Sequence, residues 1–194
     1  MNAVASAPPD PRSRGAGPTG ESDAVVVRRL AAGEPGARQA LYERFAPVVR
    51  GIALAHLPSQ DAGDLEQDVF VHVFGRIGQL RDAHALGGWV ASVARNLARD
   101  RLRRLRRRPR AVPIDDAAVA TRDRAGHELA ERVMVLVRSL PEAYRETLLM
   151  RLVEGLSGPE IAERTGMTHG SVRVNLSRGM ALLRPQLTAE GWCG

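Results

Sequence analysis

Cysteine, lysine and long apolar runs are scarce or absent in this chain of 194 residues. Its one cysteine, Cys193, excludes an internal disulfide framework and a zinc site built from cysteines. No apolar run reaches the roughly 18 residues that a bilayer-spanning helix needs. The first twenty residues also lack the apolar core of a secretion signal. With 44% hydrophobic and 26% charged residues, the composition is typical of a soluble globular protein, which we expect in the cytoplasm.

Because lysine is absent, all 28 basic residues are arginines, and against 22 acids they give a net charge of +6. A high genomic GC content explains arginine in place of lysine, but it does not explain their clustering. Nine arginines and one acid, Asp100, lie within residues 95–110, so this stretch carries +8 and the remainder −2. Guanidinium groups bind phosphate oxygens bidentately and release condensed counterions. The cluster therefore indicates a polyanionic partner.

Composition and periodicity divide the chain into five segments. Residues 1–22 are rich in proline, glycine and alanine, which predicts a disordered tail. Residues 23–108 have helical periodicity, which is lost over residues 109–126, the predicted linker. Helical periodicity returns over residues 127–187, and residues 188–194 form a short tail. We therefore expect an all-α fold of two small helical domains joined by a flexible linker, with a helix-turn-helix in the C-terminal domain.

Glycine and proline predict the helix boundaries of the first domain. Breaks at residues 33–36, 57–59 and 87–88 divide residues 23–108 into about four helices. We find no internal repeat.

The second domain contains the pattern of a helix-turn-helix. A capping box at residues 157–160 begins a short helix, Gly166 ends it, and Thr168 caps a longer helix that extends to about Arg184. An exposed Val174 among polar neighbours suits contact with a thymine methyl group in the major groove. The alternative is a plain helical hairpin with no role in DNA binding. The candidate DNA-contacting residues are Gly170, Ser171, Arg173, Val174, Ser177 and Arg178.

An acidic strip marks one helix of the first domain. Asp64, Asp68 and His72 are spaced at i, i+4 and i+8, so they line one side of that helix. They invite comparison with a metal site, and a metal-dependent hydrolase is the corresponding enzyme hypothesis. However, eight residues span about 12 Å of helix axis, too long for one ion to contact all three. We favour a docking surface for a protein partner.

A basic helix follows the acidic strip. Residues 89–104 have apolar positions suited to core packing and leave Arg95, Asn96, Arg99 and Arg103 for the outer face. Opposite charges on neighbouring helices indicate a protein that contacts nucleic acid on one side and a protein partner on the other.

Two separate segments resemble one family, the extracytoplasmic-function (ECF) group of the sigma-70 family of bacterial RNA polymerase sigma factors. Residues 41–46, LYERFA, resemble the opening helix of the family's first domain, and residues 64–70, DLEQDVF, resemble its polymerase-docking helix. Residues 89–104 match W-x-x-x-x-A-R-N-x-x-x-D-x-x-R, the helix that contacts the −10 element. Residues 142–184 resemble the second domain, whose helix-turn-helix reads the −35 element.

The resemblance implies a role for each matching residue. Asp64, Gln67 and Asp68 dock on the clamp of the largest polymerase subunit. Asn96, with the loop at residues 81–87, holds a base flipped from the −10 element, which favours the melted duplex. The residues implied in −10 contacts are Arg95, Asn96, Arg99 and Arg103. The C-terminal candidates, led by Arg173, Val174, Ser177 and Arg178, read the −35 duplex.

The predicted function is a sigma factor that binds core RNA polymerase, directs it to specific promoters and stabilises −10 melting. The implied partners are core RNA polymerase, promoter DNA and an anti-sigma factor, without membrane insertion. We expect no enzyme activity, metal or cofactor, because no nucleophilic triad or glycine-rich phosphate loop is recognisable. The alternative is a stand-alone helix-turn-helix regulator of duplex DNA. The acidic strip favours the sigma factor, because such a regulator needs no polymerase-docking surface.

Overall fold

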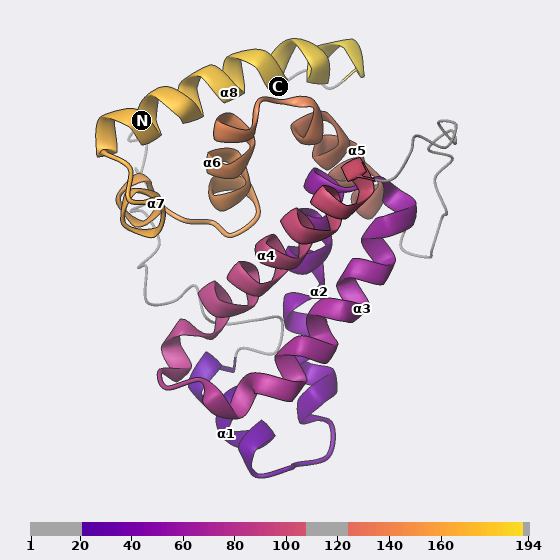
Figure 1. Ribbon diagram of the computed structural model, residues 1–194, viewed down its shortest axis with the longest axis vertical. Coiled ribbons are helices and arrows are strands. Elements are labelled where there is room, and N and C mark those ends of the chain that lie inside the picture. The colour runs from indigo at the N-terminus through magenta and orange to yellow at the C-terminus, as the bar shows by residue number, and fades with distance from the viewer. Residues whose placement is uncertain (1–20, 108–123, 192–194) are drawn as a thin grey trace, which may run out of the picture.

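The computed structural model describes residues 21–107 and 124–191. Within these ranges the chain forms α-helices and two short 3-10 helices, and no strand is present, so the predicted all-α class is confirmed. In chain order the elements are α1 (Asp23–Ala31), α2 (Ala37–His56), α3 (Ser59–Arg76), η2 (Ile77–Gln79), η3 (Ala83–Ala85), α4 (Leu86–Arg107), α5 (Arg124–Ser139), α6 (Glu142–Leu152), α7 (Gly158–Thr165) and α8 (His169–Ala189). Figure 1 shows α1 at one end of the long axis and α8 across the other.

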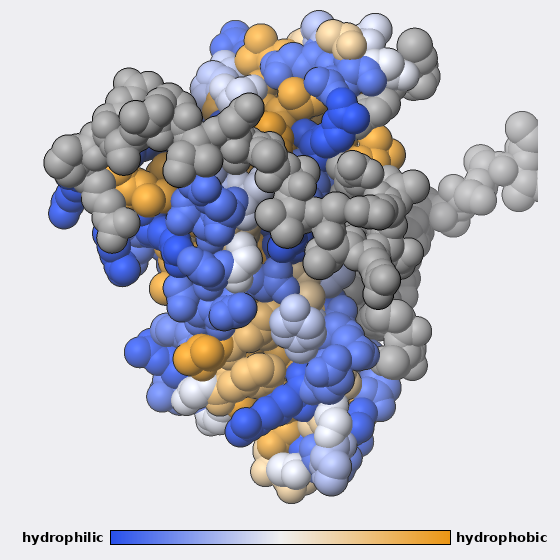
Figure 2. Space-filling model, turned by 90° about the vertical axis from the view of Figure 1, so that its right-hand side faces the viewer, coloured by the Kyte–Doolittle hydropathy of each residue, from blue (hydrophilic) through white to orange (hydrophobic). Residues whose placement is uncertain are grey.

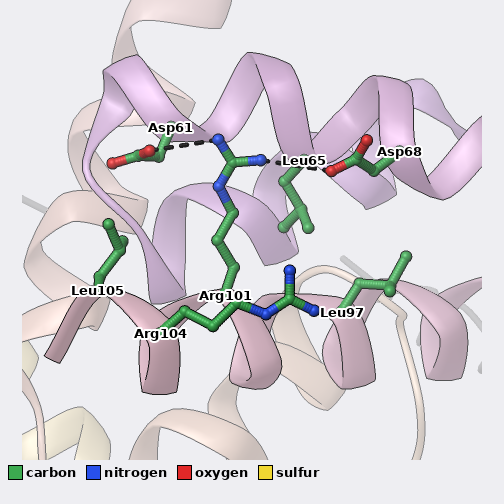
Figure 3. Close-up of a pocket in the computed structure, with 7 residues that line it drawn as sticks. All are labelled: Asp61, Leu65, Asp68, Leu97, Arg101, Arg104 and Leu105. Carbon is green, nitrogen blue, oxygen red and sulfur yellow. Dashed lines mark hydrogen bonds and ion pairs between the residues drawn. The ribbon is translucent and has the colours of Figure 1, made fainter. Parts of the chain in front are cut away.

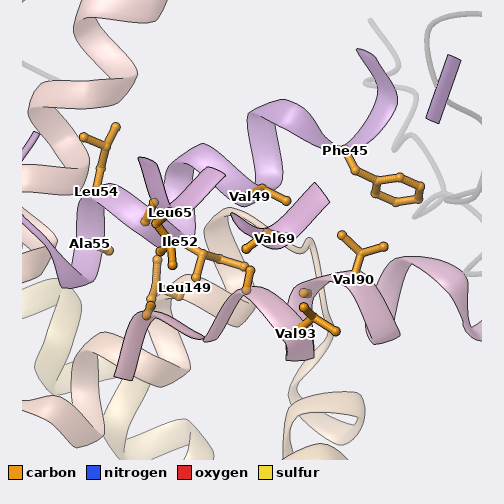
Figure 4. Close-up of a cluster of buried hydrophobic side chains, with 14 of the residues drawn as sticks. Phe45, Val49, Ile52, Leu54, Ala55, Leu65, Val69, Val90, Val93 and Leu149 are labelled. Atoms are coloured by element: carbon orange, nitrogen blue, oxygen red, sulfur yellow. The ribbon is translucent and has the colours of Figure 1, made fainter. Parts of the chain in front are cut away.

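The first helical group consists of α1 to α4, with η2 and η3 before α4. Helices α2, α3 and α4 pack against one another around a continuous apolar core (Figure 4). Leu41 and Val49 of α2, Leu65 of α3 and Val90 of α4 are all fully buried in it. The apolar positions recur at helical spacing, so each helix turns one stripe towards its neighbours. Charged residues such as Asp64 and Asp68 of α3 and Arg103 of α4 are thereby left on the outer sides of these helices.

Two of the three predicted breaks in this group are confirmed, and one is wrong. The chain turns between α1 and α2 and again between α2 and α3, as expected. Residues 87–88 instead lie in the first turn of α4, and the break is at residues 77–85. Glycine costs little in a first turn, whose N–H groups have no intrahelical acceptor in any case. A Cβ at Gly88 would lie 2.6 Å from Nη2 of Arg164, so this glycine permits a close approach.

The second helical group consists of α5 to α8, and α7 and α8 form the predicted helix-turn-helix. Ser157 and Glu160 make the reciprocal capping box that begins α7. Gly166 ends α7 in the left-handed conformation at φ 71°, which a residue without Cβ adopts at no steric cost. The side chain of Thr168 then accepts a hydrogen bond from the N–H of Ser171 at 3.1 Å and begins α8. The sequence therefore predicted the capping box, the turn glycine and the threonine cap correctly.

Helix α8 is longer than predicted and continues to Ala189 rather than ending near Arg184. It contains Pro185, so the proline did not mark the end of the helix. Where α8 crosses α6, Gly179 is buried, and a Cβ there would lie 2.8 Å from Cδ1 of Leu148. This glycine lets α8 seat closely on α6 and fixes which side of α8 faces outward.

The two helical groups share one core. Helix α5 packs on α2, and Met134, Val137 and Leu149 join the same buried cluster as Ile52. Leu149 is labelled beside the α2 and α3 residues of this cluster in Figure 4. Residues 109–123 of the predicted linker lie outside the described residues, as does most of the predicted N-terminal tail, and the linker's last three residues belong to α5. The sequence did not predict this contact between the groups.

Among the described residues on the face that Figure 2 shows, hydrophilic side chains predominate, with smaller hydrophobic patches between them. Among the described helices, none combines the length and apolarity that crossing a bilayer requires.

Candidate functional site

The acidic strip lies on the outer side of α3. Asp64 and Asp68 have side chains that are 69% and 64% exposed, and Gln67 beside them is exposed as well. The opposite side of this helix carries Leu65 and Val69, which are buried against the neighbouring helices. Packing of the apolar stripe therefore holds the strip towards solvent, as the sequence predicted.

An arginine of the basic helix α4 pairs with this strip and links α4 to α3. The guanidinium of Arg101 contacts Oδ2 of Asp64 at 2.9 Å, Oδ2 of Asp68 at 3.3 Å and Oδ1 of Asp61 at 3.4 Å. Figure 3 shows the contacts with Asp61 and Asp68. The partner of these carboxylates is thus an arginine, and His72 lies half-buried further along α3. In the part of the chain that the structure describes, no cluster of three or more acidic, histidine or cysteine residues is arranged to hold a metal.

The four predicted −10 residues of α4 do not share one environment. Asn96 and Arg103 are exposed, and Arg103 pairs with Asp100 one turn earlier in the same helix. The side chain of Arg99 is 42% exposed. Arg95 is only 4% exposed, so it does not lie on the outer face that the sequence predicted. The reason is that the second helical group covers this part of α4.

Glu154, which follows α6, is the carboxylate that covers Arg95. The two side chains form an ion pair in which each is 5% exposed, and Nη1 of Arg164 lies 3.8 Å from Oε2 of the same carboxylate. Burial lowers the pKa of Arg95, against the attraction of Glu154. Burial likewise raises the pKa of Glu154, more than the two arginines lower it. Both directions mark a desolvated pair whose charges were taken out of water.

Glu146 of α6 makes a second bridge between the groups. Its Oε1 lies 2.7 Å from Nε2 of His56, and its Oε2 accepts a hydrogen bond from Nη2 of Arg99 at 2.9 Å. Nδ1 of His56 lies 2.8 Å from the carbonyl oxygen of Ile52, so each ring nitrogen faces an oxygen atom. Burial raises the pKa of Glu146, but His56 and Arg99 outweigh it and hold the pKa at about 2.

The predicted DNA-facing side of α8 is open. Val172, Gly179 and Leu183 are buried against the rest of the second group, which turns the opposite side outward. No acid within residues 21–107 or 124–191 forms an ion pair with Arg173 or Arg178. The side chain of Thr168 caps the helix beside this face. Exposed on it are all six candidates, Gly170, Ser171, Arg173, Val174, Ser177 and Arg178.

The residues that sequence reasoning missed are those that pair across the two groups. Glu146 lies 90 positions from His56 and 47 from Arg99, and Glu154 lies 59 from Arg95. Glu146 lies within α6 and Glu154 in the turn that follows it, and no local pattern distinguishes either acid from a solvated glutamate. Arg101 was inside the recognised arginine cluster, but its carboxylate partners lie on another helix.

Comparison with known proteins identifies both groups. The family model for sigma-70 region 2 matches residues 41–108, and that for sigma-70 region 4 matches residues 130–183. A probable RNA polymerase sigma factor, RfaY, of Xanthomonas campestris pv. campestris is 31% identical over 179 residues. That match covers 85% of this chain and 44% of RfaY, so the chain spans less than half of that relative.

Two further matches cover both helical groups. The ECF RNA polymerase sigma-E factor of Escherichia coli K12 is 27% identical over 171 residues, covering 81% of this chain and 90% of the relative. The structure of CnrH in complex with the cytosolic domain of CnrY has the same fold, with a TM-score of 0.60 and 21% identity. It covers 86% of this chain and 97% of the CnrH chain. Two sigma-70 regions matched in order, together with these relatives, show that the chain belongs to the ECF group of the sigma-70 family, a family of transcription initiation factors.

Proposed function

We propose that this sigma factor binds core RNA polymerase, directs it to specific promoters and stabilises the melted −10 element. The observation that carries the proposal is the outward face of α8, where six candidate residues are exposed after a correctly capped helix-turn-helix. Cationic side chains with an exposed Val174 on such a helix suit both phosphate contact and base reading in the major groove. In this proposal residues 127–187 form the −35-reading domain and residues 23–108 the polymerase and −10 domain.

The acidic strip is the proposed docking surface for polymerase. Asp64, Gln67 and Asp68 project from α3, and Arg101 holds the carboxylates of the two aspartates in position. A basic surface on the clamp of the largest subunit contacts the exposed side of these carboxylates, beside Arg101. Because the strip is exposed, docking requires no unfolding of the first group.

Helix α4 is the proposed −10 contact. Asn96 is exposed and its amide offers both donors and an acceptor to the edge of a flipped base. Arg103 is also exposed, and Arg99 is partly so, which suits contact with the phosphates on either side of that base. Arg95 belongs to the same proposed surface but is covered in the described arrangement.

A regulatory protein is a further proposed partner. CnrH, which shares the fold, was solved in complex with the cytosolic domain of CnrY. We infer that an anti-sigma factor binds this chain too, in the cytoplasm, and restricts its access to polymerase or promoter.

Run-off transcription tests the function directly. The purified chain, added to core RNA polymerase and a library of chromosomal fragments, is expected to yield discrete transcripts that core polymerase alone does not make. Asp68→Arg should reduce polymerase binding in a pull-down about tenfold, because an arginine there repels a basic clamp surface. The matched control is Glu43→Arg, at an exposed position of α2. Tight, sequence-specific binding of duplex DNA by the chain alone, without transcripts, would favour the stand-alone regulator.

A further inference from the structure

Two acids of the second helical group form ion pairs with the arginines of α4 that are proposed to contact DNA. Glu154 is buried between Arg95 and Arg164, and Arg164 also donates to the carbonyl oxygen of Gly88 at 3.4 Å. Glu146 bridges His56 of α2 and Arg99 of α4. Two arginines and one histidine of the first group therefore meet two carboxylates of the second.

The same face is shaped for close approach. A Cβ at Gly51 of α2 would lie 3.1 Å from Cγ1 of Val153, and one at Gly88 of α4 would lie 2.6 Å from Arg164. On the far side of α2, the guanidinium of Arg50 contacts Oε1 of Glu131 at 2.6 Å. The ion pairs are thus backed by fitted surfaces and by the shared apolar core, and they are not isolated bridges at a rim.

We propose that the second helical group is an autoinhibitory cover for α4, in which Glu146 and Glu154 occupy the arginines that otherwise bind promoter phosphates. This inference rests on the proposed function of α4. A carboxylate and a phosphate offer the same paired oxygens to a guanidinium, so they compete for one group. At 4% exposure Arg95 is out of reach of any strand until the second group moves away. Separation of the two groups is therefore a step that precedes −10 binding.

A reversible disulfide across the contact tests whether closure inhibits. The Cβ built on Gly51 lies 3.9 Å from Cβ of Val153, close to the separation of about 3.8 Å in natural disulfides. In a Cys193→Ser background, Gly51→Cys with Val153→Cys should cross-link on oxidation. Neither position belongs to the proposed DNA or polymerase surfaces.

The oxidised variant is expected to lose at least tenfold in transcription and in affinity for a mixed-sequence single-stranded DNA, and reduction should restore both. The single variant Val153→Cys, treated identically, controls for oxidation without crowding Gly51. Equal activity of the oxidised and reduced forms would overturn the proposal, as would failure of the two cysteines to cross-link. Loss of transcription in the reduced form and in the parent chain would instead count against the proposed function.

Removal of the two carboxylates tests the opposite direction. In the same Cys193→Ser background, Glu146→Gln with Glu154→Gln should raise the affinity of the free chain for single-stranded DNA about tenfold. It should also widen the distance between spin labels at Val71→Cys and Ala189→Cys. The matched control, Glu142→Gln with Glu163→Gln, changes two exposed acids of the same helical group, one in α6 and one in α7, and should do neither. Wider separation without a gain in affinity would contradict an inhibitory role, and so would an unchanged distance.

Discussion

The arginines of α4 and those of α8 are similar in sequence but differ in state. Arg95 and Arg99 are paired with acids of the opposite helical group, whereas Arg173 and Arg178 are exposed and form no ion pair with any described residue. The difference arises because α8 turns its apolar side inward against α6, while the equivalent outer side of α4 is itself a packing surface. An arginine cluster in a sequence therefore indicates affinity for anions, but the fold decides which anion is bound.

The largest expected effect of this difference is on how the free energy of unfolding depends on pH. The pKa of Glu146 is depressed from 4.5 to about 2, which corresponds to about 3 kcal/mol at most. A depressed carboxyl pKa stabilises the folded state fully above pH 4.5, and the contribution is lost as pH falls towards 2. The raised pKa of Glu154 acts in the opposite direction, so the wild-type profile alone does not isolate Glu146.

Urea unfolding at several pH values measures the effect. The free energy of unfolding of wild type should exceed that of Glu146→Gln near neutral pH, and the gap should close between about pH 4.5 and 2. Glu142→Gln, which removes an exposed acid of the same helix, should show no such gap. A gap of constant size across this range would contradict the assigned pairing.

Substitutions on α8 should affect DNA affinity without affecting stability. Arg173→Ala and Arg178→Ala each remove an exposed cation, and each should cost the holoenzyme about 1–3 kcal/mol in affinity for its −35 duplex where the arginine contacts a base edge. Where it contacts a phosphate, the slope of affinity against salt should fall by about one instead. The control is Arg76→Ala, at an exposed position of α3. An equal loss of DNA affinity in this variant would show that the effect comes only from the change in net charge.

Arg103→Ala has the smallest expected effect, because Arg103 lies at an exposed position near the C-terminal end of α4. Its ion pair with Asp100 is exposed, and surface pairs contribute about 0–1 kcal/mol. The free energy of unfolding, measured by urea at neutral pH, should therefore change by less than about 1 kcal/mol. A loss of 2 kcal/mol or more would mean that this end of the helix is also covered.

Local signals predicted much of the fold correctly. The helix-turn-helix followed from a capping box, a glycine in the left-handed region and a threonine cap, each of which acts within four residues. The acidic strip followed from helical spacing alone. The same kind of signal failed at two positions. Gly88 permits a close approach of Arg164 to α4, and Pro185 is tolerated inside α8. One glycine can mark a break or a close approach, and the sequence does not distinguish them.

The covered state of Arg95 lay beyond sequence reasoning. It depends on Glu154, 59 positions away, and on how α6 sits against α2 and α4. Long-range pairs of this kind follow from the packing of two whole helical groups, which local periodicity does not encode. The helix that carried the strongest resemblance was thus the one whose exposure was least predictable.

Arg101 has a consequence for how a promoter is engaged. It joins three carboxylates of α3 to α4, and the two helices also pack in one core, so the proposed docking strip and Asn96 belong to one packed unit. In the proposed function, attaching the strip to polymerase then also fixes the position of Asn96. Capture of the flipped base becomes an intramolecular event, governed by an effective local concentration and no longer by the concentration of free protein.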